Sequence, residues 1–276
     1  MSQTRKLFLF VGLPLVIVLV GTVLYSLKGD TASNPSSTTE QTVTEEKNTD
    51  AKSVTWSFDG KTWRSSGEAP DCVTPLALKT PVDISKATSI LYPGQTRGGN
   101  YKPHGGFRFD GLKNSDITVT APYDAIVTQA SRYIEQGEIQ YLFEFVNECG
   151  VAYRFDHLLT LSPKFQALAD QLPEAKVDDS RTTKLEPTAV TAGEIIATAV
   201  GFAKTSNVGV DFGVYDLRNM NDASKSDAYQ ATHENFASLT FFGTCWLDLL
   251  PDDVKTVAKA LPGGDGQAGK QSDYCK

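Results

Sequence analysis

Histidine is scarce in this chain, and clusters of basic residues are missing from most of it. Only three of the 276 residues are histidines, namely His104, His157 and His233, so a metal or acid/base site built on imidazole draws on these positions. The formal net charge is −7 and the isoelectric point is near 5.1. Because nucleic-acid binding depends on clustered positive charge, this composition argues against a nucleic-acid partner.

Charged residues are missing from Leu7 to Leu27, a run that follows Arg5 and Lys6 and ends before Lys28. A run of this length suffices for a helix to cross a bilayer, and it lacks the small-residue cleavage site of a signal peptide. Positive charge before the run predicts a cytoplasmic amino terminus. We therefore expect residues 1–28 to anchor a single-pass protein in the cell membrane, with an extracytoplasmic carboxyl-terminal domain.

Aromatic side chains are absent from residues 29–53, where Ser, Thr and acidic residues dominate. Such a segment buries too little apolar surface to fold, so we expect a disordered linker. Residues 54–276 suit one domain with elaborations. We divide them into a hairpin and loop extension at 54–90, a central β domain at 91–216, and a carboxyl-terminal cap at 217–276.

The spacing Cys-x-x-Cys is also absent. All four cysteines lie in the part of the chain that we expect to be exported, where disulfides are favoured over zinc thiolates. Four cysteines allow three pairings, and we favour Cys245 with Cys275, which fastens the tail, and Cys72 with Cys149. The sequence itself leaves the pairing open.

Long helical periods are missing from the middle of the chain, where short apolar runs alternate with turn residues. This pattern predicts a mainly β fold, a compact antiparallel sheet or sandwich with one or two short helices. Helical spacing occurs only at 163–172 and 251–261, and the polar segment 173–188 resembles a surface loop. The runs with strand character are 117–121, 125–129, 141–146, 151–157, 194–200 and 208–215.

An Asp-Gly pair at Asp59 and Gly60 separates two short alternating runs and predicts a β-hairpin at 54–64. Its aromatic residues offer two interpretations. They form a stacking surface for a sugar, or they bury against the domain, and we favour burial. These residues are Trp56, Phe58 and Trp63.

The segment His104–Asp110 combines a rare histidine, paired glycines and alternating aromatics. On an extended chain His104, Arg108 and Asp110 share one face with Gly106, while Phe107 and Phe109 take the other. Glycines beside the histidine let another backbone or a ligand come close. We therefore expect a functional site on a strand here.

Residues 91–216 resemble the LytM or lysostaphin-type zinc metallopeptidase domain. That family has a compact antiparallel β fold with a groove, and its members cut or bind peptidoglycan peptides. The motifs that carry the resemblance are His104-Gly-Gly106-Phe107, Ala121-Pro122-Tyr-Asp124-Ala-Ile-Val127, Tyr153-Arg-Phe-Asp-His157-Leu158, Ala192-Gly193-Glu-Ile-Ile196 and Val210-Asp211-Phe212-Gly-Val214.

The resemblance implies a degenerate metal site. His104 keeps the position of the first zinc ligand, and His157 keeps that of an assisting catalytic histidine. Arg108 stands where the family has the ligand Asp, and Asp211 stands where it has the ligand His. Arginine stays protonated and does not bind zinc. We therefore expect an Arg108–Asp211 ion pair in place of the metal.

A gapped alternative keeps zinc. It takes His104, Asp110 and Asp211 as ligands and His157 as the catalytic base, but the two extra residues require a sharp bend in the strand.

Three functions remain open. The first, which we favour, is a catalytically degenerate groove that binds cell-wall peptide or regulates a cell-wall hydrolase, with His104, Arg108, Asp110, His157 and Asp211 lining it. The second is an active zinc-dependent peptidoglycan endopeptidase, and the third is a structural surface domain without a groove function.

Overall fold

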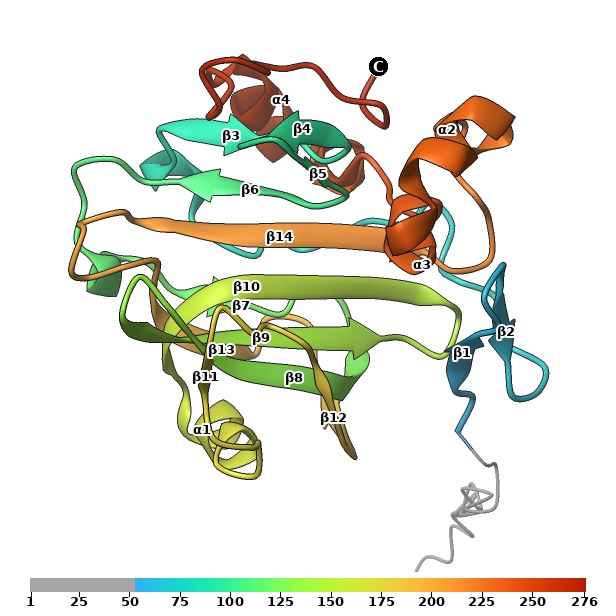
Figure 1. The fold of residues 1–276 in the computed structure, drawn as a ribbon, viewed down its shortest axis with the longest axis horizontal. Helices are drawn as coiled ribbons and strands as arrows, with labels where there is room; N and C mark the ends of the chain where they lie inside the picture. The colour runs from blue at the N-terminus through green and yellow to red at the C-terminus, as the bar shows by residue number, and fades with distance from the viewer. Residues whose placement is uncertain (1–52) are drawn as a thin grey trace, which may run out of the picture. The chain divides into compact units, whose positions relative to one another are not determined.

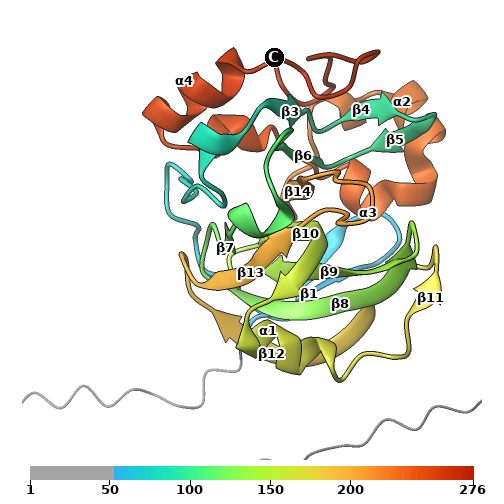
Figure 2. The same ribbon diagram turned by 90° about the vertical axis from the view of Figure 1, so that its left-hand side faces the viewer.

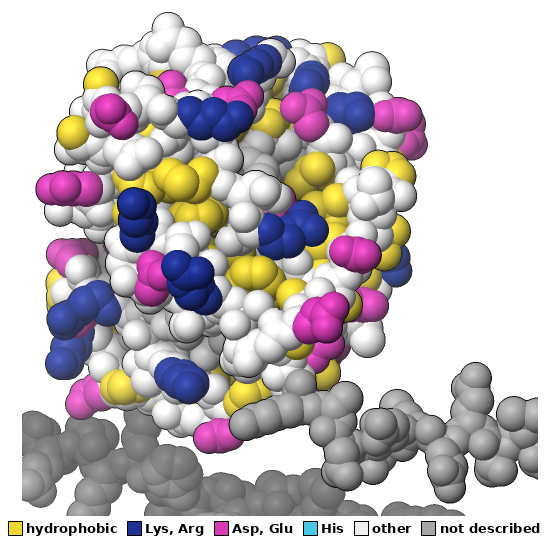
Figure 3. Space-filling model, turned by 90° about the vertical axis from the view of Figure 1, so that its right-hand side faces the viewer, with side chains coloured by type: hydrophobic (Ala, Val, Ile, Leu, Met, Phe, Trp, Pro, Cys, Tyr) yellow, Lys and Arg dark blue, Asp and Glu magenta, His cyan; other side chains and the backbone are white. Residues whose placement is uncertain are grey.

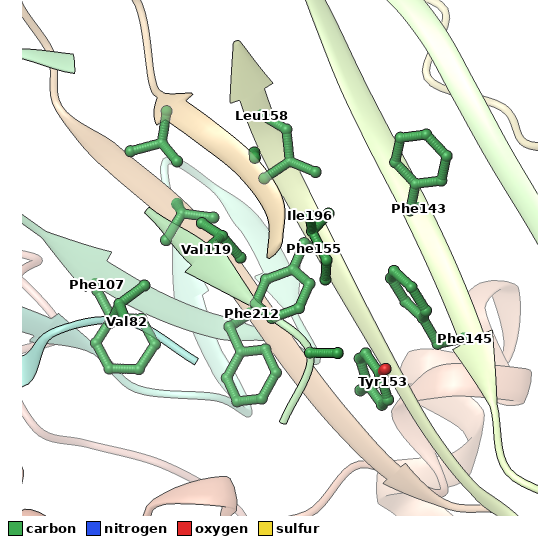
Figure 4. Close-up of a cluster of buried hydrophobic side chains, with 14 of the residues drawn as sticks. Val82, Phe107, Val119, Phe143, Phe145, Tyr153, Phe155, Leu158, Ile196 and Phe212 are labelled. Carbon is green, nitrogen blue, oxygen red and sulfur yellow. The ribbon is translucent and has the colours of Figure 1, made fainter. Parts of the chain in front are cut away.

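Aromatic residues at alternate positions of three long strands build the centre of the molecule. Phe143 and Phe145 lie on β9 (Glu138–Val146), Tyr153 and Phe155 on β10 (Val151–Leu161), and Phe212 on β14 (Gly209–Asp216). All five are almost fully buried. Because side chains on a strand alternate between faces, these residues point to one side and form the core shown in Figure 4.

The computed structural model describes residues 53–276, all within one unit of the chain, Asp50–Lys276. The expected membrane helix at 1–28 and all of the expected linker except Ser53 lie outside the described residues. No helix within 53–276 is long and apolar enough to span a membrane.

Ten strands form one mixed sheet, and the mainly β fold expected from the sequence is confirmed (Figure 1). The strand order is β11-β8-β9-β10-β14-β6-β3, with β12 paired to β8, β13 paired to β10, and β7 paired to β13. All these pairs are antiparallel except β11 with β8. The remaining strands of this sheet are β3 (Ser89–Leu91), β6 (Gly105–Arg108), β7 (Val119–Thr120), β8 (Ala125–Glu135), β11 (Lys176–Val177), β12 (Thr183–Val190) and β13 (Ile195–Val200).

Two hairpins and several short helices surround this sheet (Figure 2). The hairpins are β1 (Trp56–Phe58) with β2 (Trp63–Ser65), and β4 (Gln95–Arg97) with β5 (Asn100–Lys102). The α-helices are α1 (Pro163–Ala169), α2 (Asp227–His233), α3 (Ala237–Thr240) and α4 (Asp252–Ala260). Short 3-10 helices occupy Ile84–Lys86, Asn114–Asp116, Ala223–Lys225, Glu234–Phe236 and Trp246–Leu249.

The hairpin around Asp59 and Gly60 packs its aromatic residues on the domain, as favoured from the sequence. Trp56 Nε1 donates to the Glu148 carbonyl at 3.0 Å, and Trp63 Nε1 donates to the Ser238 carbonyl at 2.8 Å. These bonds fix the Trp56 indole against the turn between β9 and β10 and the Trp63 indole against α3. On the side of the molecule where β1, β2, α2 and α3 lie, acidic and basic side chains are interspersed among hydrophobic ones (Figure 3).

The carboxyl-terminal segment lies along the edge strand β3. The Ile90 N–H donates to the Pro262 carbonyl, and the Gly264 N–H donates to the Ile90 carbonyl. These bonds pair backbone groups that an edge strand otherwise leaves open. Both favoured disulfides are confirmed, and Cys245–Cys275 holds this segment while Cys72–Cys149 ties the loop after the hairpin to the turn before β10.

The expectation of a surface loop at 173–188 is wrong at Lys176–Val177, which form β11, and for its second half. Residues Thr183–Val190 form β12, which pairs with β8. The sequence of β12 shows no apolar alternation, because it contains Pro187 and most of its side chains are exposed. Among the described residues β12 pairs with β8 alone, and it buries only Leu185 and Val190.

Candidate functional site

Asp211 lies between two of the three histidines on the face of the sheet opposite the aromatic core. Its Oδ2 atom is 2.9 Å from His104 Nε2 and 3.7 Å from His157 Nε2. His104 directly precedes β6, while Asp211 and His157 come from β14 and β10. The structure thus brings together three residues that the sequence predicted as a site.

Two glycines of the segment His104–Asp110 explain how β6 fits beside its neighbours. A Cβ atom on Gly105 would lie 2.2 Å from the Leu91 carbonyl oxygen, and one on Gly106 would lie 2.4 Å from the Val210 carbonyl oxygen. Real Cβ atoms do not approach other atoms so closely. The close approach of neighbouring backbone to β6 therefore requires glycine at both positions, 105 and 106, as expected from the sequence.

The electrostatic environment keeps Asp211 ionised and disfavours protonation of His104. Burial raises the pKa of the Asp211 carboxyl, but His104, His157 and Arg97 outweigh it, so the pKa is well below its usual range. Burial lowers the pKa of His104, and Asp211 only partly opposes this. We assign the neutral imidazole with its proton on Nε2, which then donates to Asp211. The buried Nδ1 atom of His104 has no partner in the described part of the chain.

His157 has a left-handed backbone conformation, with φ at 62°. This conformation is uncommon for any residue other than glycine and is frequent at functional sites. It coincides with a register shift between Phe155 and Leu158 in the pairing of β10 with β9. The irregularity brings the side chains of the adjacent residues Asp156 and His157 to one group with Tyr133, Asp211 and His104, which we call the polar cluster. Tyr133 donates to Asp156 Oδ1 at 2.6 Å, and its hydroxyl lies 3.4 Å from His157 Nδ1.

Arg154 continues the polar cluster along β10. Its Nη2 atom donates to Asp156 Oδ2 at 2.9 Å. Burial opposes the positive charge of Arg154, but Asp156 and other acidic groups nearby raise its pKa above the usual range. Burial also raises the pKa of the Glu144 carboxyl on the neighbouring strand β9, and Arg154 opposes this shift. A largely buried charged pair and a partly buried acid therefore extend the site away from His104.

The strand register aligns these side chains into a row that crosses the sheet. Pairing partners follow one another from strand to strand: Lys184 with Gln129, Gln129 with Glu144, Glu144 with Arg154, and Arg154 with Gly213. A Cβ atom on Gly213 would lie 2.9 Å from His104 Cβ, so His104 comes next. Five strands and the residue before β6 thus contribute to one row, which spans about 24 Å over its five intervals at ~4.8 Å each. We call this the polar row; its members are Lys184, Gln129, Glu144, Arg154, Gly213 and His104.

A cavity of about 400 Å³ opens over one part of the polar row. Glu144, Arg154 and Lys184 line it on the polar side. The next cross-strand row, Val146 with Ala152 and Ala152 with Tyr215, gives it an apolar floor toward the hairpin. Trp56 and Trp63 also line the cavity. It therefore joins charged groups to an apolar surface.

The predicted ion pair between Arg108 and Asp211 is wrong. Arg108 Nη2 lies 3.6 Å from Asp110 Oδ1, and Gly106, not Arg108, stands opposite Asp211 in the strand pairing. Arg108 stands opposite Gly209, the first residue of β14, two positions along the strand from Asp211. The guanidinium that contributes to the low pKa of Asp211 is that of Arg97, which is held by the Tyr92 and His104 carbonyls.

The donor groups do not fit the alternative zinc site of His104, Asp110 and Asp211. Asp110 lies beyond the end of β6, and its carboxylate accepts from Thr88 and contacts Arg108. Within residues 53–276 no group of three or more His, Cys, Asp or Glu side chains is arranged to hold a metal ion. His233 stacks on Tyr229 at the end of α2, outside the polar cluster.

Sequence reasoning missed Arg97, Tyr133, Glu144, Arg154 and Asp156. A signal for two of them was present, because Arg154 and Asp156 interrupt an otherwise apolar strand, and buried charges require partners. Arg97 gave no such signal, since it lies in a separate short hairpin. Comparison of the chain with models of protein families, with curated proteins and with solved structures gives no match.

Proposed function

We propose that this chain binds a cell-wall peptide along the polar row and the adjoining polar cluster and does not cleave it. The proposal takes its fold family, the LytM-like groove, from the sequence motifs of residues 91–216. The observation that carries it is the contact of Asp211 with His104 at 2.9 Å, because the carboxylate that replaces a metal ligand is engaged by the remaining ligand histidine. A buried, hydrogen-bonded network is suited to recognising polar groups of a ligand.

The dimensions of the polar row support a peptide as the ligand. A row about 24 Å long matches roughly seven residues of extended peptide at ~3.3 Å per residue. His157 and Asp211 keep side-chain exposures of 21% and 17%, so a ligand on the surface reaches them. The neighbouring cavity offers an apolar surface beside the charged groups.

The location that we propose is the outer side of the cell membrane, with the amino-terminal segment as the anchor. Two disulfides in the described part support an oxidising compartment. Protease added to intact spheroplasts should release a soluble fragment by cutting within residues 29–53. Recovery of an intact, protected chain would contradict this location.

Cosedimentation with purified peptidoglycan tests the binding function. The full-length chain, purified in a non-ionic detergent, should sediment with the polymer, while the number of free amino groups in the polymer stays at the level of the buffer control. New amino groups that appear with added zinc would instead indicate an endopeptidase. A chain that stays in the supernatant would contradict the proposal and favour a structural role.

A further inference from the structure

Glu144 and Arg154 stand directly opposite each other on β9 and β10, yet they form no ion pair within 4.0 Å in the described structure. Opposite charges at such cross-strand positions usually interact. Arg154 instead pairs with Asp156 through Nη2, and this is its only side-chain hydrogen bond among residues 53–276. The Glu144 carboxylate accepts no hydrogen bond there.

Both of these side chains line the cavity of about 400 Å³. Its polar side therefore presents an acceptor, the Glu144 carboxylate, next to a guanidinium with donor capacity left over, and the Lys184 side chain also lines it. An ammonium ligand would meet repulsion from Arg154 and Lys184, and a carboxylate ligand would meet repulsion from Glu144 and from Asp156, which pairs with Arg154. A neutral group that both donates and accepts satisfies both sides.

The apolar part of the cavity lies one residue pair further along the strands. Val146 and Ala152 form its floor, and Leu217 and Leu239 border it beside the hairpin. Trp56 Nε1 and Trp63 Nε1 already donate to backbone carbonyls, so the two indoles offer the cavity apolar rather than donor surface. An occupant thus needs an apolar substituent next to its polar group.

We infer that the cavity binds a secondary amide that carries an apolar substituent, as in an apolar residue of a peptide. The amide N–H donates to Glu144, the amide carbonyl accepts from Arg154, and the substituent lies on Val146 and Ala152. This inference deepens the proposed peptide binding, on which it rests for the biological source of the amide. The cavity itself is independent of that source.

The three tryptophans allow a direct test. Trp56 and Trp63 line the cavity, whereas Trp246 packs between Phe107 and Phe212 in the core on the other face of the sheet. The full-length chain in detergent, labelled with 5-fluorotryptophan, gives one fluorine resonance per indole. The probes are N-methyl-4-methylpentanamide and the matched ester methyl 4-methylpentanoate, which lacks the N–H donor.

The amide should shift the resonances of Trp56 and Trp63 saturably in the millimolar range and leave that of Trp246 unchanged. The ester should bind about tenfold more weakly or worse, because the hydrogen bond to a charged acceptor is lost. Glu144→Leu should reduce the amide affinity to that of the ester, while Glu186→Leu, an exposed position outside the cavity, should not. The Trp246 resonance reports whether each variant is folded.

Equal affinities for amide and ester, or no shift at Trp56 and Trp63, would overturn the inference whatever the variants show. Cosedimentation with peptidoglycan separates the two proposals. A chain that sediments with peptidoglycan but ignores the amide refutes the cavity assignment alone, and a chain that binds the amide but not peptidoglycan refutes the proposed function alone.

Discussion

The imidazole of His104 and the carboxylate of Asp211 meet across the β6–β14 pair, with Nε2 and Oδ2 2.9 Å apart and both side chains largely buried. This contact joins two positions that resemble metal-ligand positions in the LytM family. Because a buried carboxylate without a partner is costly, His104 stabilises the fold as well as the site.

Replacing His104 with Ala should therefore destabilise the domain by about 2 to 4 kcal/mol, since it leaves Asp211 with only the longer contact to His157. Arg108→Ala should change the free energy of unfolding by less than about 0.5 kcal/mol, because Arg108 is part-exposed and its contact with Asp110 is long. Urea unfolding of both variants measures this difference. A larger loss of unfolding free energy for Arg108→Ala would contradict this account and favour the Arg108–Asp211 ion pair predicted from the sequence.

Stability should fall as the pH decreases from about 7 to 5.5, and His104 should account for part of the fall. Burial, Arg154 and Arg97 lower the pKa of His104 in the folded state, with Asp211 opposing them. Below the pKa of histidine in the unfolded chain, near 6.5, the unfolded chain binds a proton that the folded chain does not bind as readily. The free energy of unfolding therefore decreases. The slope from one such group is at most about 1.4 kcal/mol per pH unit.

The variant His104→Gln isolates this contribution, because every other titrating group is retained, including Glu144. Urea unfolding at several pH values should give a shallower slope for His104→Gln than for the wild-type chain. Identical slopes would show that His104 does not resist protonation in the folded state.

Gly213 should be intolerant of a side chain, because Tyr215 lies across it. A Cβ atom at this position would lie 2.5 Å from the Tyr215 hydroxyl oxygen and 2.9 Å from His104 Cβ. Gly213→Ala should therefore cost about 1 to 3 kcal/mol through displaced neighbours. Gly209→Ala, on the same strand, meets its nearest atom, the Phe107 carbonyl oxygen, at 3.2 Å and should cost less. Equal melting temperatures for the two variants would contradict this account.

Both disulfides should stabilise the domain, each by about 2 to 4 kcal/mol, mainly through constraint of the unfolded chain. Thiol counting under denaturing conditions should find no free cysteine, since the described structure contains none. Because its loop is longer, Cys72–Cys149, with a sequence separation of 77, should contribute more than Cys245–Cys275, with a separation of 30. Serine pairs at each bridge and chemical unfolding test this order, and the reverse order would contradict the loop-length explanation.

Local patterns in the sequence predicted much of the fold. The hairpin at Asp59 and Gly60, the helix predicted at 163–172 and found at Pro163–Ala169, and the strand predicted at 151–157 and found at Val151–Leu161 depend on turn chemistry and on alternation within a few residues. The resemblance also placed His104, His157 and Asp211 in one site, where the structure brings them together. These features need no knowledge of which strands are neighbours.

The polar row could not be predicted, because it depends on the register between strands that are far apart in the chain. The β9–β10 pairing places Glu144 opposite Arg154. Lys184 joins the row because β12 pairs with β8, and the polar sequence of β12 did not predict a strand. The Arg108 prediction failed for the same reason. Sharing a face with Asp211 was not enough, since the register sets Arg108 opposite Gly209.

The central claim, that the polar row and the polar cluster bind peptidoglycan peptide, is tested most directly by the fraction of chain that cosediments with purified peptidoglycan after replacement of His157, a member of the polar cluster. Asn suits the left-handed backbone at this position, so His157→Asn removes the imidazole with little backbone strain. His233→Asn is the matched control, because His233 lies outside the polar cluster. We expect the wild-type chain and His233→Asn to sediment alike and His157→Asn to sediment severalfold less. Equal sedimentation of all three chains, or none by the wild type, would contradict the claim.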